Sequence, residues 1–97
     1  MEGQYDTARP IQKHSWPMEL VFTENDDATR ADIVFDVGGR RYHGWGRARR
    51  NPNDPEIPRI GEEVAAARAL TRLAQQLLAA AGEEIEGFEG HPVTVHI

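Results

Sequence analysis

The sequence predicts an α+β domain: a three-stranded antiparallel meander (β-β-β-α) with one long helix packed on one face. Three observations predict it. Two runs of alternating apolar residues come first, and the second run ends at Gly38-Gly39, a typical two-residue hairpin turn. A third extended run follows this turn. A proline-rich loop then leads into one long stretch of helical periodicity, the only segment able to cover a sheet.

The 97 residues suffice for a single domain. Residues 1–14 are polar and aperiodic, so they are predicted to form a disordered arm, and residues 15–97 are predicted to form the domain. The chain has no cysteine, which excludes disulfides and thiolate metal sites. No apolar run approaches the roughly 20 residues that span a bilayer, and none is typical of a signal peptide. We therefore expect a cytoplasmic protein without membrane contact.

The strands are expected at residues 16–23, 29–37 and 40–49. Alternate residues give the first two strands an apolar face: Met18, Leu20 and Phe22, then Ala31, Ile33, Phe35 and Val37. The third strand has two unlike faces. One face carries Tyr42, Gly44, Gly46 and Ala48, and its small residues would let the helix lie close to the sheet.

The helix is expected to begin after an N-cap at Gly61 and to end near Ala81, with Gly82 as its stop. Its predicted buried stripe is Val64, Ala67, Leu70, Leu73, Ala74, Leu77 and Leu78. Ile85 and Phe88 are expected to anchor the acidic stretch that follows. Residues 91–97 are expected to form a short tail or an edge strand through Val93 and Val95.

The other face of the third strand is the candidate site. Five of the eleven cationic residues lie between positions 40 and 50, although the net charge is −5. The predicted surface consists of Arg41, His43, Trp45, Arg47, Arg49 and Arg50. Arginine binds phosphate through two donors, and an indole can stack on a base. The same composition also suits a homodimer interface or a charged strand edge that resists aggregation, so these alternatives stay open.

No pattern indicates catalysis. The histidines lack metal-binding spacing, and no dinucleotide-binding motif or ordered serine–histidine pair can be drawn. The protein is therefore expected to be non-enzymatic, with no cofactor, metal or small-molecule substrate.

Several short motifs carry a family resemblance. They are Thr29-Arg30-Ala31, Gly44-x-Gly46-x-Ala48-Arg49, Asn51-Pro52-x-Asp54, Pro58-x-Ile60-Gly61-Glu62-Glu63, Ala67-Arg68-Ala69-Leu70 and His91-Pro92-Val93. Together they resemble a family of short actinobacterial proteins classed as a domain of unknown function and linked to hypoxia and dormancy. The resemblance implies a double-stranded-RNA-binding-domain-like fold, a homodimer, and a shape similar to ribosome hibernation factors. Trp45 and Arg47 depart from the aliphatic residues usual in that family.

We therefore expect a protein of stress or dormancy that contacts the ribosome or ribosomal RNA through its arginines, with Trp45 stacking on a base. The alternative is a homodimeric interaction module with no nucleic-acid partner.

Overall fold

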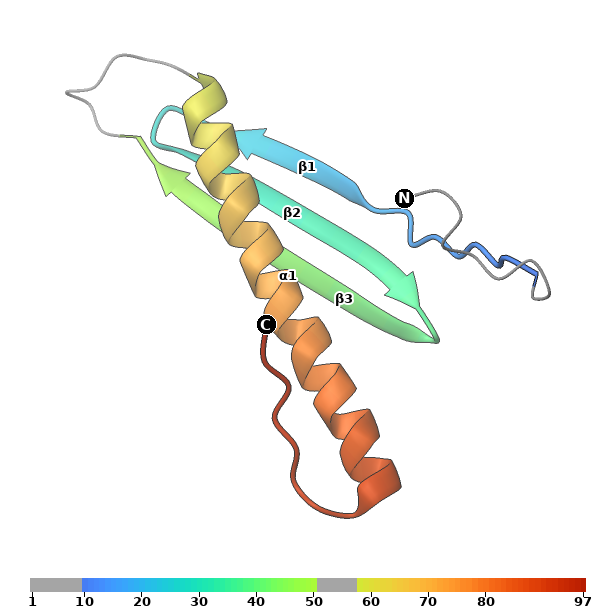
Figure 1. Cartoon of the computed structure of the whole chain (residues 1–97). Helices are drawn as coiled ribbons and strands as arrows, with labels where there is room; N and C mark the ends of the chain where they lie inside the picture. Colours follow the sequence, from blue (N-terminus) through green and yellow to red (C-terminus); the bar gives the residue numbers. More distant parts are fainter. Residues whose placement is uncertain (1–9, 51–57) are drawn as a thin grey trace.

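The fold has two layers, a sheet and a single helix. The computed structural model describes residues 10–50 and 58–97. Its elements are β1 (Glu19–Glu24), β2 (Ala28–Val37), β3 (Arg40–Arg49) and α1 (Pro58–Glu89). The strands form one antiparallel sheet in the order β1-β2-β3, and α1 crosses one face of it (Figure 1). The predicted fold class is therefore confirmed.

The predicted arm and loop lie only partly within the described residues. Residues 10–14 form neither helix nor strand, whereas residues 1–9 and 51–57 are outside the described part of the chain. The disorder predicted for residues 1–14 stays a prediction. β1 begins at Glu19 rather than at residue 16, beyond Pro17, which has no N–H for a ladder. Trp16 nevertheless packs near Phe35, with 5.8 Å between ring centroids.

Both strand connections follow from local chemistry. Gly38 and Gly39 have φ angles of 58° and 76°, as a type I′ turn requires at both central positions. In the turn between β1 and β2, the side-chain Oδ1 of Asn25 accepts hydrogen bonds from the backbone N–H groups of Asp27 and Ala28 at 2.8 and 2.9 Å. This side chain fixes the turn by replacing a backbone acceptor.

The core lies between α1 and the strands β2 and β3. Its buried residues are Ala31, Ile33, Phe35, Tyr42, Ala48, Ala65, Ala69, Leu73 and Ala80. The helix comes closest to the sheet at Gly44 and Gly46, as predicted. A Cβ atom on Gly46 would lie 2.5 Å from the backbone nitrogen of Ala69, and one on Gly44 would lie 2.8 Å from Cβ of Leu73. Only glycine permits this backbone contact.

The helix buries only part of the predicted stripe: Leu77 packs against the core as expected, and Ala74 and Leu78 are half-buried. Leu73 is buried as expected, but Val64 and Leu70 are 36% and 51% exposed, and the buried residues over β3 are instead Ala65 and Ala69. At the contact with Gly46 the residues against the strand are the small Ala65 and Ala69, while the larger Val64 and Leu70 lie to the sides of the contact. The prediction was wrong for Val64 and Leu70 because it ranked helix faces by hydrophobicity alone.

The predicted helix ends were also wrong. α1 begins at Pro58, where proline suits a first helical position, and continues to Glu89. Gly82 lies inside the helix, and the end of the chain packs closely against it. A Cβ atom there would lie 3.0 Å from the carbonyl oxygen of Val93. Gly90, with a φ of 76°, ends the helix, and its N–H donates to the carbonyl of Glu86 at 2.7 Å.

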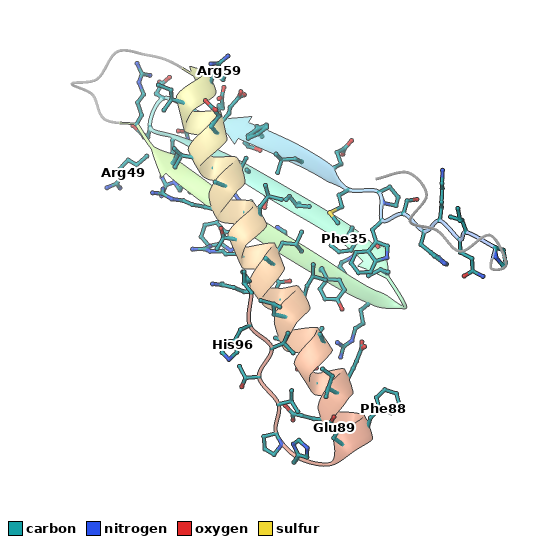
Figure 2. The ribbon with its side chains drawn as sticks, viewed as in Figure 1. Phe35, Arg49, Arg59, Phe88, Glu89 and His96 are labelled. Atoms are coloured by element: carbon teal, nitrogen blue, oxygen red, sulfur yellow. The ribbon has the colours of Figure 1, made fainter. Side chains whose placement is uncertain are left out.

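The last residues run back along α1 and form no strand (Figure 1). The N–H of Val93 donates to Oε2 of Glu86 at 3.2 Å. Phe88 is 92% exposed and points away from the body at the end of the helix (Figure 2), so it is not the predicted anchor, whereas Ile85 is half-buried. In the described residues, no helix has the length and apolar character needed to cross a membrane.

We expect Gly46→Ala to destabilise the fold by about 1–3 kcal/mol, the usual cost of overpacking, because the methyl group would push α1 off β3. Gly87→Ala is the matched control. Gly87 lies in α1, and no atom stands within 4 Å of the place that its Cβ would take, so alanine there should stabilise by up to about 1 kcal/mol. Urea unfolding measures both changes. Equal stability of Gly46→Ala and the wild type would contradict the close contact.

Candidate nucleic-acid interface

The predicted surface lies on the face of the sheet that α1 leaves open. Residues of β3 alternate strictly, so Arg41, His43, Trp45, Arg47 and Arg49 are exposed and the residues between them are buried. The structure therefore puts the predicted side chains of β3 on one face. These side chains do not share one environment, because the two ends of the strand differ in whether carboxylates pair with their basic side chains.

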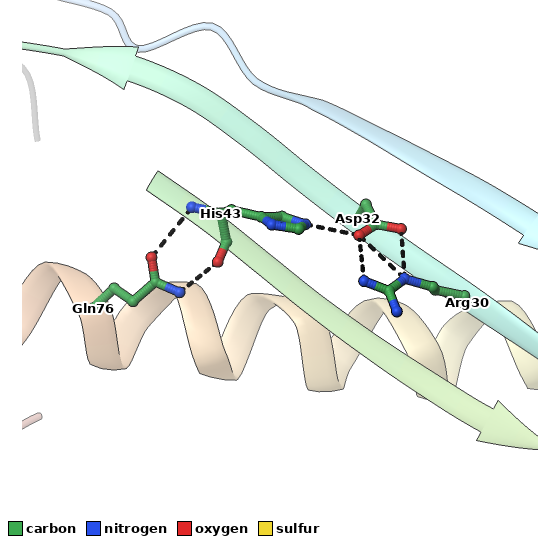
Figure 3. A network of polar contacts seen from close by, with 4 residues as sticks. All are labelled: Arg30, Asp32, His43 and Gln76. Carbon is green, nitrogen blue, oxygen red and sulfur yellow. Dashed lines mark hydrogen bonds and ion pairs between the residues drawn. The ribbon is translucent and has the colours of Figure 1, made fainter. Parts of the chain in front are cut away.

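Near the hairpin, the side chains of Arg41 and His43 are held by carboxylates of β2. Nε of Arg41 lies 3.1 Å from Oδ1 of Asp36, the residue directly opposite in the strand register. Nε2 of His43 lies 2.7 Å from Oδ1 of Asp32, which also pairs with Arg30 at 3.0 Å (Figure 3). A phosphate would have to compete with these carboxylates.

Asp32 is the centre of this polar network. Its carboxylate accepts hydrogen bonds from Arg30, the larger cause, and from His43, and these hold the pKa of Asp32 below its ordinary value of 3.8. The side chain is 27% exposed, so the pairing is screened only in part. The network keeps Asp32 ionised and fixes the imidazole and one guanidinium over the sheet.

Trp45 is already in contact with two arginines. The Cζ atoms of Arg72 and Arg30 lie 3.7 and 4.6 Å from its ring centroid. Each such contact is worth about 0.5–1 kcal/mol at an exposed site. A nucleic-acid base that stacks on this ring would compete with these guanidinium groups, a constraint that the sequence pattern did not reveal.

Side chains of α1 cover the open edge of β3. The N–H of His43 donates to Oε1 of Gln76 at 3.2 Å, and Nε2 of Gln76 donates to the carbonyl of His43 (Figure 3). Nη1 of Arg68 donates to the carbonyl of Arg47 at 2.6 Å. Arg68, Arg72 and Gln76 are spaced by four residues and therefore share one flank of the helix. Arg68 and Gln76 satisfy backbone groups of an edge strand that would otherwise be open to another strand, and Arg72 lies over the Trp45 ring.

Beyond Trp45 the cations are not neutralised in this way. In residues 10–50 and 58–97, no carboxylate forms an ion pair with the side chains that we call the arginine cluster: Arg47, Arg49, Arg68 and Arg72. Arg50 has another role, since its N–H donates to the carbonyl of Asp27 at 2.8 Å and its Nη1 lies 3.5 Å from the carbonyl oxygen of Asp26.

Sequence reasoning missed the contribution of the helix to the cluster. The four-residue spacing of Arg68, Arg72 and Gln76 is a signal that was available. The residues that the structure describes also include no group of three histidine, aspartate or glutamate side chains that could hold a metal ion.

Comparison with known proteins places the chain in a family. The model of the Rv2632c-like family matches residues 14–94. The chain belongs to the Rv2632c-like family. It is 40% identical to the uncharacterized protein Rv2632c of Mycobacterium tuberculosis over 77 residues, which cover 79% of this chain and 83% of that protein. It is 32% identical to the uncharacterized protein Mb1767 of Mycobacterium bovis over 87 residues, covering 90% and 92%.

A solved structure supports the same assignment. The crystal structure of Rv2632c superimposes with a TM-score of 0.79 at 34% identity, covering 87% of this chain and 100% of that one. The predicted membership of a family of small actinobacterial proteins of unknown function is therefore confirmed. The names of the two relatives record no activity.

We expect Asp32→Asn to lower the free energy of unfolding at pH 7 by up to about 1 kcal/mol. A carboxylate with a lowered folded-state pKa stabilises the fold above its unfolded pKa of about 3.9, and this contribution is lost as pH falls through the lower folded value. The difference between variant and wild type should therefore shrink toward pH 3 in urea titrations.

Asp36→Asn is the control for this test. It breaks the more exposed pair with Arg41, whose side chains are 71% and 62% exposed, so it should cost less at pH 7. An undiminished Asp32→Asn difference at pH 3 would show that the carboxylate charge is not what stabilises.

Proposed function

We propose that this protein is a non-enzymatic, cytoplasmic RNA-contacting protein that binds ribosomal RNA through the arginine cluster. One observation carries the proposal. β3 and α1 bring Arg47, Arg49, Arg68 and Arg72 to one edge of the sheet, and no carboxylate in the described residues pairs with them. Guanidinium groups match the geometry of phosphate oxygens and bind them with two donors.

The acidic net charge shapes how such binding would work. With a charge of −5, the molecule as a whole repels a polyanion, so attraction must come from the cluster at short range. Binding of this kind depends steeply on salt, because it is driven by the release of counterions from the phosphates. It also favours one orientation, with the arginine edge toward the RNA.

Trp45 has a different role in this proposal from stacking on a base. Its ring lies 3.7 Å from Cζ of Arg72, so the indole orients a guanidinium that α1 contributes. The ring then positions a phosphate-binding group, and the contact needs no particular base. Recognition would follow the RNA backbone and not its sequence.

The biological setting rests on the family resemblance. A link to dormancy or stress, a double-stranded-RNA-binding-domain-like fold, and a role like that of ribosome hibernation factors belong to this proposal. The last of these is an analogy of fold, which transfers function weakly. The arginine cluster gives it a surface on this chain that can be tested.

We expect co-sedimentation with ribosomes to weaken steeply as salt rises. Arg47→Ala and Arg68→Ala should each weaken binding and lower the log–log salt slope by about 0.7–0.9, the loss of one phosphate contact. Arg59→Ala and Arg40→Ala are matched controls, because these exposed arginines pair with Glu63 and Glu83 outside the cluster. Absence of a bound fraction at low salt would refute the proposal.

The alternative, a homodimeric interaction module using the same face, makes a separate prediction. Arg47→Glu or Trp45→Ala would then convert a dimer to a monomer, as measured by light scattering. Loss of RNA binding with an unchanged mass would favour the RNA proposal over this alternative.

A further inference from the structure

The two edges of the sheet are not equivalent. α1 closes the edge at β3, where Gln76 and Arg68 bond the backbone of His43 and Arg47. The other edge is β1, the outer strand on the far side of β2 from β3, which pairs only with β2 among the described residues (Figure 1). The outer side of β1 therefore presents backbone groups that no described strand satisfies, which suits pairing with another strand.

The inner face beside β1 is also incompletely covered. α1 packs mainly on β3 and β2, so Leu20 and Phe22 are only half-buried and Met18 is 46% exposed. Leu70 is 51% exposed. At about 3.6 residues per turn, Leu70 lies about half a turn from the helix flank that covers β3, so it faces the β1 side. These four apolar residues form what we call the β1 strip.

The sequence of β1 is complementary to itself. An antiparallel pairing of two copies about a twofold axis at Val21 places Val21 opposite Val21, Leu20 opposite Phe22, and Glu19 opposite Thr23. Leu20 and Phe22 then face each other, no two carboxylates within the strand are opposed, and Glu24 faces Met18, which lies just before the strand. Moving the axis by one residue either way places Glu19 opposite Val21, or Leu20 opposite Glu24. Of these three registers, only the axis at Val21 places neither glutamate opposite an apolar residue of the strand itself.

We propose that β1 pairs with β1 of a second copy of this chain, antiparallel about Val21. The two sheets then form one continuous six-stranded sheet, and the two β1 strips meet between the helices. Because the β3 edge is closed by the helix, assembly stops at two copies and does not continue into a filament. The interface differs from the open face around Trp45, and it leaves both arginine clusters at the outer edges.

Single cysteines test the pairing directly, because the chain has none of its own. Opposed Cα atoms in an antiparallel pair lie about 4.5–5.5 Å apart, within the range that a disulfide spans. Val21→Cys should therefore form a disulfide-linked dimer on mild oxidation. Val34→Cys is the matched control: it lies on the same face, 43% exposed, but on β2, one strand further from the axis in each copy. It should stay unlinked.

The register has its own test. Glu19→Cys and Thr23→Cys should each give little cross-linking alone, because each cysteine faces the other position in the second copy. An equimolar mixture of the two variants should give the linked heterodimer on a non-reducing gel. Efficient linking by Glu19→Cys alone would overturn the proposed register.

Light scattering on the wild type should give the mass of two 10.9 kDa chains. Val21→Lys places two ammonium groups side by side at the axis, and dimer affinity should fall at least about tenfold, while circular dichroism shows the fold retained. A monomeric wild type, a Val21→Lys variant as dimeric as the wild type, or equal linking by Val34→Cys and Val21→Cys would each overturn the proposal. None of these outcomes depends on RNA binding.

Discussion

The contact of the α1 backbone with β3 at Gly44 and Gly46 is the constraint on which the rest of the structure depends. It brings the helix within hydrogen-bonding reach of the strand edge, so that Arg68 and Gln76 can bond the main chain of β3. The same approach carries Arg72 over the edge to the indole. A larger residue at either glycine would lift the helix and separate the cations that the two elements bring together.

The parts of the fold set by local chemistry were predictable from the sequence. The Gly38-Gly39 turn, the alternation of β3 and the small face under the helix each follow from the residues concerned. The helix face was only partly predictable from periodicity, because Ala65 and Ala69 are buried by the close backbone contact at Gly46, which hydrophobicity alone does not indicate. The end at Gly82 was missed because that glycine serves the returning chain and not a helix stop.

The candidate site, too, could be predicted from the sequence only in part. The spacing of β3 put its arginines on one face, but it could not show which of them have carboxylate partners. That depends on strand register, which sets Asp36 beside Arg41, and on the side-chain reach of Asp32. The spacing of β3 also could not show that α1 contributes half of the arginine cluster. The two surfaces proposed for this member of the Rv2632c-like family lie at opposite edges of the sheet, so one can be occupied without blocking the other.

The length of α1 has a further consequence. Its 32 residues extend about 48 Å, whereas a ten-residue strand extends about 33 Å, so the last turns project past the sheet. Among the described residues, those last turns pack against the returning chain end, where Val93 contacts Gly82 and Glu86. We therefore expect amide protons near Ala69 to exchange with solvent only when the whole molecule opens, and those near Gly87 to exchange through local fraying. The single helix is thus expected to open as two cooperative units, one packed on the sheet and one held by the final residues of the chain.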